Sequence, residues 1–185
     1  MNFNSHSALS GKHALLSPSN YSWINYTEQK LDARYIAARA AARGTSLHDL
    51  AHQAITLGVK LSNADKTLAA YVKDGIGYKM RVEQPLYYSD NCFGTADTIS
   101  FRNRFLRIHD LKTGNGKTSE HQLEVYAALF CLEYSVSPWD IEIELRIYQC
   151  EEVRRYIPSP DGILFIMDKI ITFDHRIEML KEGGA

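Results

Sequence analysis

The chain contains few cysteines and no long apolar run, and both absences exclude whole classes of protein. Its 185 residues include Cys92, Cys131 and Cys150, without C-x-x-C spacing. This pattern argues against a disulfide framework and against a zinc ribbon. No apolar run approaches the ~18 residues that cross a membrane, and Met1–Ser10 lacks an apolar signal-peptide core. We therefore expect a cytoplasmic protein with no membrane partner.

An excess of charge is also missing. The formal net charge is −1, with 23% charged and 45% hydrophobic residues. Any surface that binds a polyanion must therefore be a local basic patch. Residues 1–17 are rich in Ser, Asn and His, which predicts a flexible N-terminal arm. The remaining residues, 18–185, are enough for a single domain with a substantial core.

Hydrophobic periodicity predicts helices in the first half of the chain. The segment Ser17-Pro18-Ser19-Asn20 offers cap residues for a short aromatic helix, and the alanine-rich run that follows predicts a longer one ended by Gly44. A new helix is expected to begin at Thr45 or Ser46, where a hydroxyl can cap it. The expected helices cover residues 21–26, 28–43, 45–57 and 63–73.

The second half alternates between strand and helix patterns. Strands are expected over residues 78–86, 92–101, 104–111 and 141–148, with Asn103 in a hairpin turn and Glu142 and Glu144 on an exposed face. Helices are expected over 119–134 and 162–180, and residues 151–161 form a link between elements. This order predicts an α/β fold in which a small mixed β-sheet is flanked by α-helices.

Two aspartates and a lysine are expected to meet at the central hairpin. Asp110 and Lys112 are two residues apart and share a face of the third predicted strand. Asp97 lies on the preceding strand, so the hairpin can bring the two carboxylates side by side. Such a cluster is costly unless a cation or a phosphorylated ligand binds there. A divalent metal holding a phosphodiester would satisfy all three groups.

Four segments in order resemble the PD-(D/E)XK nuclease superfamily, and within it the RecB-like branch that includes phage exonucleases. They are Gly44-Thr45-Ser46-Leu47-His48, Gly94-x-x-Asp97, Asp110-x-Lys112 and Gln122-x-x-x-Tyr126. The resemblance spans residues 18–149. It implies a restriction-endonuclease-like sandwich and a hydrolase that cuts nucleic acid with a metal ion.

The resemblance also implies roles for individual residues. His48, Asp97, Asp110 and the main-chain carbonyl of Leu111 would bind Mg²⁺ or Mn²⁺. Asp97, Asp110 and Lys112 would be catalytic. The substrate strand would contact Gln122, Tyr126 and Lys117, all in or just before the helix predicted over 119–134. The partner would be DNA with a free end, cut by an exonuclease of phage or bacterial recombination and repair.

The pair His48 and His52 allows other interpretations. The two imidazoles lie four residues apart on one helix face, as in the H-E-x-x-H zinc site of metalloproteases. Asp49 is one methylene short of the catalytic glutamate, and no third zinc ligand is evident. A HD-domain phosphohydrolase would need further ligands in helices, which are missing. We interpret His52 as structural. Glu83 is either a salt-bridge partner or an outer member of the acidic cluster.

A second phosphate-binding motif competes with the nuclease interpretation. Gly114-Asn115-Gly116-Lys117-Thr118 lies between a predicted strand and a predicted helix, as a Walker A loop does. The full pattern needs glycine where Leu111 stands, and the only Walker B candidate, 164–168, is predicted to be helical. A P-loop NTPase is therefore less favoured.

A non-cleaving nucleic-acid-binding or protein-interaction module with the same fold stays open as well. The sequence leaves DNA against RNA, single against double strands, strand polarity, exonuclease against endonuclease action and one against two metals undecided. It also leaves open whether the chain needs a homo-oligomer or a recombination partner protein.

Overall fold

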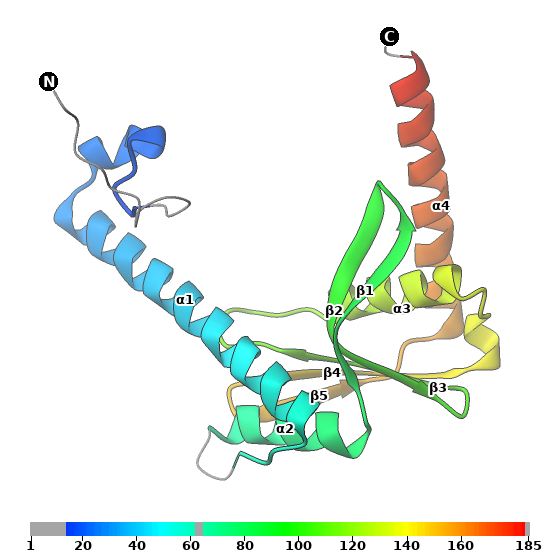
Figure 1. Ribbon diagram of the computed structural model, residues 1–185. Coiled ribbons are helices and arrows are strands. Elements are labelled where there is room, and N and C mark those ends of the chain that lie inside the picture. Colours follow the sequence, from blue (N-terminus) through cyan, green and yellow to red (C-terminus); the bar gives the residue numbers. More distant parts are fainter. Residues whose placement is uncertain (1–13, 62–64, 184–185) are drawn as a thin grey trace, which may run out of the picture. The chain divides into compact units, whose positions relative to one another are not determined.

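The computed structural model describes residues 14–61 and 65–183 (Figure 1). Its contacts divide the chain into two compact units, residues 1–45 and 46–185. Most of the predicted N-terminal arm, residues 1–13, lies outside the described residues, and the boundary at residue 18 stays a prediction. Within the described ranges, no helix is both long and apolar enough to cross a membrane.

The first unit begins with a short helix whose cap, Ser17, is one of the four predicted cap residues. A 3-10 helix, η2 (Pro18–Asn25), follows Ser17, whose side-chain oxygen accepts a hydrogen bond from the Ser19 amide at 3.3 Å. The indole of Trp23 donates to the Ser17 carbonyl at 3.0 Å. The cap and the Trp23 side chain therefore fix the same turn.

One long helix replaces the two helices predicted over residues 28–57. Helix α1 (Glu28–Leu57) includes Gly44 without interruption, so the predicted break there is wrong. The Thr45 hydroxyl donates to the Ala41 carbonyl one turn back, at 3.3 Å, instead of capping a new helix. Glycine inside a helix costs only about 1 kcal/mol. The alanine-rich turns before it, together with Ala51 and Ile55, which are buried after it, outweigh that cost.

The second unit is built on a five-stranded mixed sheet. The strands β1 (Arg81–Ser89), β2 (Cys92–Arg102), β3 (Phe105–Leu111), β4 (Glu142–Gln149) and β5 (Glu152–Tyr156) lie in the order β1-β2-β3-β4-β5. Only the β3–β4 pair is parallel. The helices are α2 (Lys66–Gly77), α3 (His121–Glu133) and α4 (Pro160–Gly183), with a short 3-10 turn η3 (Pro138–Asp140) before β4.

Helices cover both faces of this sheet. Figure 1 shows α2 on one face, and α3 and α4 together on the other. Helix α3 connects the parallel strands β3 and β4, which is the crossover that a parallel pair requires. The prediction of an α/β chain with a mixed sheet flanked by helices is therefore confirmed.

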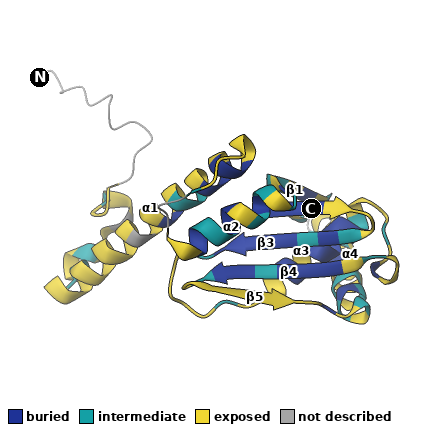
Figure 2. Ribbon diagram, turned by 90° about the horizontal axis from the view of Figure 1, so that it is seen from below, coloured by how far each residue is buried: buried dark blue, intermediate teal, exposed yellow. Residues whose placement is uncertain are grey.

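Each face of the sheet has its own apolar cluster. Ile108 and Leu145 pack against Ala127 and neighbouring residues of α3 on one side. On the other side, Leu111 and Tyr148 pack against α2 and the last turns of α1. Strands β3 and β4 are accordingly buried along most of their length (Figure 2). A strand buried on both faces holds its side chains rigidly, which suits a strand that carries a site.

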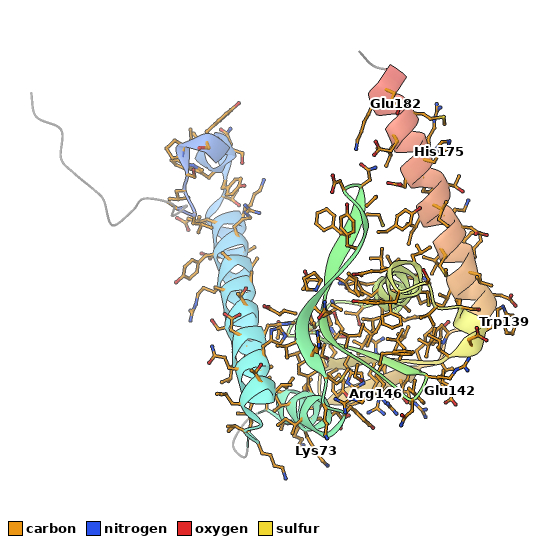
Figure 3. All side chains as sticks on the ribbon, turned by 45° about the vertical axis from the view of Figure 1, so that its right-hand side comes forward. Lys73, Trp139, Glu142, Arg146, His175 and Glu182 are labelled. Carbon is orange, nitrogen blue, oxygen red and sulfur yellow. The ribbon has the colours of Figure 1, made fainter. Side chains whose placement is uncertain are left out.

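Strand β5 was not predicted, and it changes the surroundings of Glu144. The predicted link 151–161 contains β5, which pairs antiparallel with β4. Glu144 is buried, not exposed as predicted. Its carboxylate lies 2.8 Å from Nη2 of Arg146 (labelled in Figure 3) and also contacts Arg107 and Arg155. Three guanidinium groups from three strands supply the charge that the carboxylate loses on leaving water.

Candidate functional site

The β2–β3 hairpin brings the two predicted aspartates together. Its two-residue turn, Asn103 and Arg104, has positive φ angles of 52° and 60°, as a tight hairpin requires. The register then pairs Thr98 with His109. Continued by one residue, it places Asp97 opposite Asp110, and opposed residues of an antiparallel pair share a face. The turn predicted at Asn103 is confirmed.

Asp110 is a buried carboxylate, and one of its two oxygens has no hydrogen-bond partner in the described chain. Its side chain is 4% exposed, and Oδ1 lies 3.0 Å from Nζ of Lys112. The second oxygen, Oδ2, is buried and has no hydrogen-bond partner among the described residues. Burial raises the pKa of Asp110, and the nearby Asp97 raises it further, whereas Lys112 and His48 oppose the shift. The site therefore holds a carboxylate that lacks part of its compensating positive charge.

Asp97 is more exposed and is held by two contacts. Its Oδ2 accepts a hydrogen bond from the Leu111 amide at 3.2 Å. Nδ1 of His48, which comes from α1, lies 3.4 Å from the same oxygen. About a quarter of each side chain, His48 and Asp97, is exposed. Asp97 thus tethers the end of β3 and faces the solvent beside Asp110.

A chain of hydrogen bonds positions Lys112 against Asp110. Besides its ion pair, Nζ of Lys112 donates to Oε1 of Gln122 at 3.0 Å. The amide nitrogen of Gln122 in turn donates to the Tyr126 hydroxyl at 3.4 Å. Gln122 and Tyr126 lie one turn apart on α3, so the helix that crosses from β3 to β4 also orients the lysine. The spacing of four residues had indicated that such a contact was feasible.

Gly94 lets the Tyr126 ring approach β2. A Cβ at position 94 would lie 2.9 Å from Cε1 of Tyr126, closer than carbon atoms pack. We expect Gly94→Ala to displace the ring and to lower the free energy of unfolding by about 1 kcal/mol, because overpacking forces a shift. Urea unfolding measures this.

The matched control for that change is Gly77→Ala at the end of α2, where a Cβ meets nothing within 4 Å. It should leave stability unchanged or raise it, because alanine restricts the unfolded chain. Equal stabilities of Gly94→Ala and Gly77→Ala would show that Tyr126 is not held against β2.

A buried tyrosine that the sequence analysis did not single out lies next to both carboxylates. Burial raises the pKa of the Tyr71 phenol well above its ordinary value, and the charges of Asp97 and Asp110 add to the shift. Tyr71 therefore stays neutral beside the acidic pair. Its inward position on α2 follows the helical periodicity, but nothing in the local pattern connects it with residues of the hairpin.

Other predicted residues lie outside the central contacts. The side chain of Lys117 is exposed on the β3–α3 loop, and within the described part of the chain it forms no hydrogen bond or ion pair. His52 is buried, with Nδ1 3.2 Å from a Glu83 carboxylate oxygen. Glu83 thus lies at ion-pair distance from His52, which agrees with the salt-bridge alternative. This contact favours the structural interpretation of His52.

The donors at the site suit a divalent cation in kind. Asp97 and Asp110 supply carboxylate oxygens and His48 an imidazole nitrogen, and Oδ2 of Asp110 has no hydrogen-bond partner in the described chain. In residues 14–61 and 65–183, no three His, Cys, Asp or Glu side chains already lie close enough to hold an ion. The carbonyl ligand at Leu111 stays a prediction.

The glycine-rich loop before α3 is anchored through its carbonyl oxygens. Nε2 of Gln149 donates to the carbonyls of Gly114 and Gly116, at 2.5 and 2.9 Å. The Walker B candidate, 164–168, lies inside α4, so its helical prediction is confirmed and it cannot follow a buried strand as a Walker B aspartate does. The only candidate for a Walker B strand is therefore helical, which counts against the P-loop interpretation.

The chain matches no protein-family model, no curated protein and no solved structure.

Proposed function

We propose that the chain is a divalent-metal-dependent nuclease that hydrolyses DNA phosphodiester bonds, with a restriction-endonuclease-like fold. The observation that carries the proposal is the Asp110 carboxylate. It is buried, it faces a second carboxylate across the hairpin, and a lysine ammonium lies 3.0 Å from one of its oxygens while the other has no partner in the described chain. Perturbed acidic groups of this kind concentrate at functional sites.

The topology supports the same proposal. In the superfamily that the motifs resemble, the hairpin with the two acidic residues is followed by a helix that crosses over to a further strand. Here β2 and β3 form the hairpin, α3 is the crossover, and β4 lies parallel to β3. Fold alone does not establish an activity, so the proposal depends on the residues of the site.

Four groups would hold Mg²⁺ or Mn²⁺ in this proposal: His48, Asp97, Asp110 and the Leu111 carbonyl. When bound, such an ion supplies Lewis-acid polarisation of a phosphate and a water of lowered pKa. The imidazole of His48 favours Mn²⁺ over Mg²⁺. The positive charge would also complete the environment of the buried Asp110 carboxylate.

The remaining residues act directly on the substrate. Lys112 would orient the attacking water and offset the negative charge that develops on the phosphate, because its ammonium is held at the acidic pair by Gln122. Gln122 and Tyr126 would contact the substrate strand along α3. Lys117, on the exposed loop, would pair with a phosphate further along the strand.

Cleavage of end-labelled DNA tests the proposal. Single- and double-stranded DNA, linear and circular, is incubated with Mn²⁺, Mg²⁺ or EDTA. We expect metal-dependent cleavage of linear DNA and none in EDTA, with circular DNA resistant because an exonuclease of recombination or repair requires an end. No cleavage of any form with either metal, by a chain that still binds DNA, would contradict the proposal and leave a non-cleaving binding module.

A further inference from the structure

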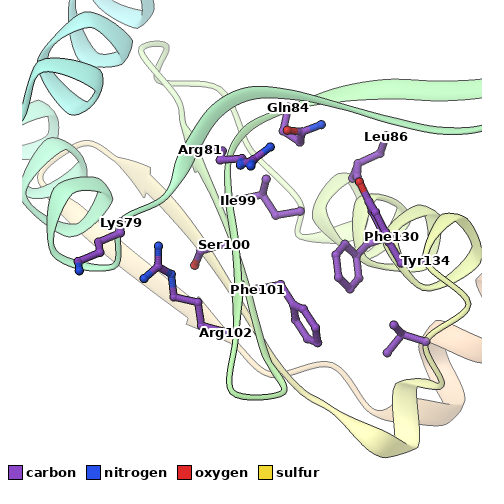
Figure 4. Close-up of a pocket in the computed structure, with 11 residues that line it drawn as sticks. Lys79, Arg81, Gln84, Leu86, Ile99, Ser100, Phe101, Arg102, Phe130 and Tyr134 are labelled. Atoms are coloured by element: carbon purple, nitrogen blue, oxygen red, sulfur yellow. The ribbon is translucent and has the colours of Figure 1, made fainter.

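A groove that the nuclease site does not use opens in the second unit, between strands β1 and β2 and the last turn of α3. It has a volume of about 480 Å³. Figure 4 shows its two ends. Basic side chains line one end and aromatic side chains the other: Lys79, Arg81 and Arg102, then Phe101, Phe130 and Tyr134.

The basic end carries positive charge without matching acids. Lys79, Arg81 and Arg102 are all exposed, and none of them forms an ion pair with a described residue. No aspartate or glutamate lines the groove. Several other arginines of this unit do have acidic partners, as Arg146 has Asp74 and Glu144. Three unpaired cations around one opening are the electrostatic surface that an anionic ligand recognises.

The aromatic end offers ring faces to a ligand. The Phe101 and Phe130 rings are 5.0 Å apart between centroids, and those of Phe130 and Tyr134 are 4.9 Å apart. Phe130 is 6% exposed and supports the outer two, Phe101 and Tyr134, which are 41% and 51% exposed. A rigid aromatic wall with exposed outer rings is suited to stacking a planar group.

Strand β2 runs from the candidate site to the groove. Every second residue of β2 from Asp97 to Phe101 lies on the same face of the strand. The four residue steps between Asp97 and Phe101 span roughly 13 Å. Helix α3 also joins the two places, with Gln122 in its first turn and Phe130 in its last.

We propose that this groove binds an unpaired stretch of the substrate strand, with phosphates at Lys79, Arg81 and Arg102 and a base stacked on Phe101 and Tyr134. The inference rests on the proposed nuclease function and specifies its substrate as single-stranded near the cut. Every base presents a flat face to an aromatic ring once it is unstacked, whereas a base inside a duplex does not. The volume of the groove suits a small-molecule-sized group such as one nucleotide.

Binding of oligonucleotides in EDTA tests this without cleavage. The probes are fluorescein-labelled oligothymidylate of about 12 nucleotides, an abasic strand of the same length, and a duplex. The variants are Arg81→Gln/Arg102→Gln and Tyr134→Leu, with Tyr134→Phe to restore the ring. The matched control is Lys169→Gln/Arg176→Gln, two exposed cations on α4. Circular dichroism melts establish that each variant is folded.

The two groove variants should impair oligonucleotide binding in different ways. Arg81→Gln/Arg102→Gln should weaken oligothymidylate binding and reduce the slope of log K against log salt by about 1.4, the value for two single-strand phosphate contacts. Tyr134→Leu should weaken it about tenfold without changing the slope, and Tyr134→Phe should restore it. On the abasic strand Tyr134→Leu should have no effect. The α4 control should bind all probes as the wild type does.

Two results would overturn the inference. One is binding of oligothymidylate by both groove variants as tight as that of the α4 control. The other is an equal loss on duplex and single strand for the arginine variant with none for Tyr134→Leu, which would indicate a general basic surface. Wild-type binding that depends on the groove, without cleavage in any metal, would keep the groove and refute the nuclease. Metal-dependent cleavage by the wild type, together with unaltered oligothymidylate binding by both groove variants, would keep the nuclease and refute the groove.

Discussion

Replacing Asp110 with asparagine is expected to lower metal-dependent DNA cleavage by at least about 100-fold while the protein stays folded. Asparagine has the same shape but cannot supply the negative charge that a divalent ion requires. Burial and Asp97 already raise the pKa of Asp110, so the folded protein resists its ionised form. Removing the charge should therefore leave the free energy of unfolding in EDTA at or above the wild-type value, which urea titration measures.

Lys112→Met should lower cleavage by a similar factor, because it removes the ammonium and keeps most of the apolar stem. Lys169→Met is the matched control, since Lys169 is an exposed lysine on α4. Initial cleavage rates on one end-labelled strand are compared for the wild type and for these two variants. A Lys112→Met variant as active as Lys169→Met would show that the contact of Lys112 with Asp110 and Gln122 is structural only.

The second large effect concerns His109, which is fully buried beside the site. Burial lowers the pKa of His109 to about 3, and the charges of Arg146 and Arg107 contribute to the shift. Its Nδ1 lies 3.3 Å from the Tyr148 hydroxyl, and Nε2 has no partner in the described chain. The ring is therefore neutral in the folded protein throughout the range in which an unfolded histidine takes up a proton.

The stability of the folded protein should therefore fall as the pH falls. Between the unfolded pKa near 6.5 and the folded pKa of about 3, the unfolded chain binds one more proton, so acid favours unfolding. From pH of about 7.5 to about 4.5, His109 alone should remove about 2.5 kcal/mol of stability. His109→Gln removes this contribution. The loss of stability over that range, measured by urea unfolding, should be smaller in His109→Gln by that amount, and an equal loss would refute the assignment.

Local patterns predicted the part of the fold that carries the site. The alternation in β2 and β3 and the turn at Asn103 are neighbours in sequence, so the register that opposes Asp97 and Asp110 needed no information from elsewhere. The spacing of four residues between Gln122 and Tyr126 likewise required only a helix. The contact of Gln122 with Lys112 followed once α3 lay over β3.

The features that the sequence patterns did not predict depend on the wider structure and not on a local signal. Helix α1 passes Gly44 because the turns on both sides of it are stable, which a local cap rule does not register. Strand β5 is polar and exposed along its length, so it lacks the alternation that marks a strand, and its pairing with β4 defines it. Glu144 is buried because Arg107, Arg146 and Arg155 converge on it from three strands.

The central claim is that a divalent cation completes the environment of the Asp110 carboxylate, and titration of Mn²⁺ into the protein tests it most directly. Calorimetry without DNA compares the wild type with Asp110→Asn and with the Lys169→Met control. We predict that the wild type and the control bind Mn²⁺ and release bound protons at mildly acidic pH, whereas Asp110→Asn binds at least about tenfold more weakly. Equal Mn²⁺ affinity of Asp110→Asn and the wild type, or no binding by either, would contradict the claim.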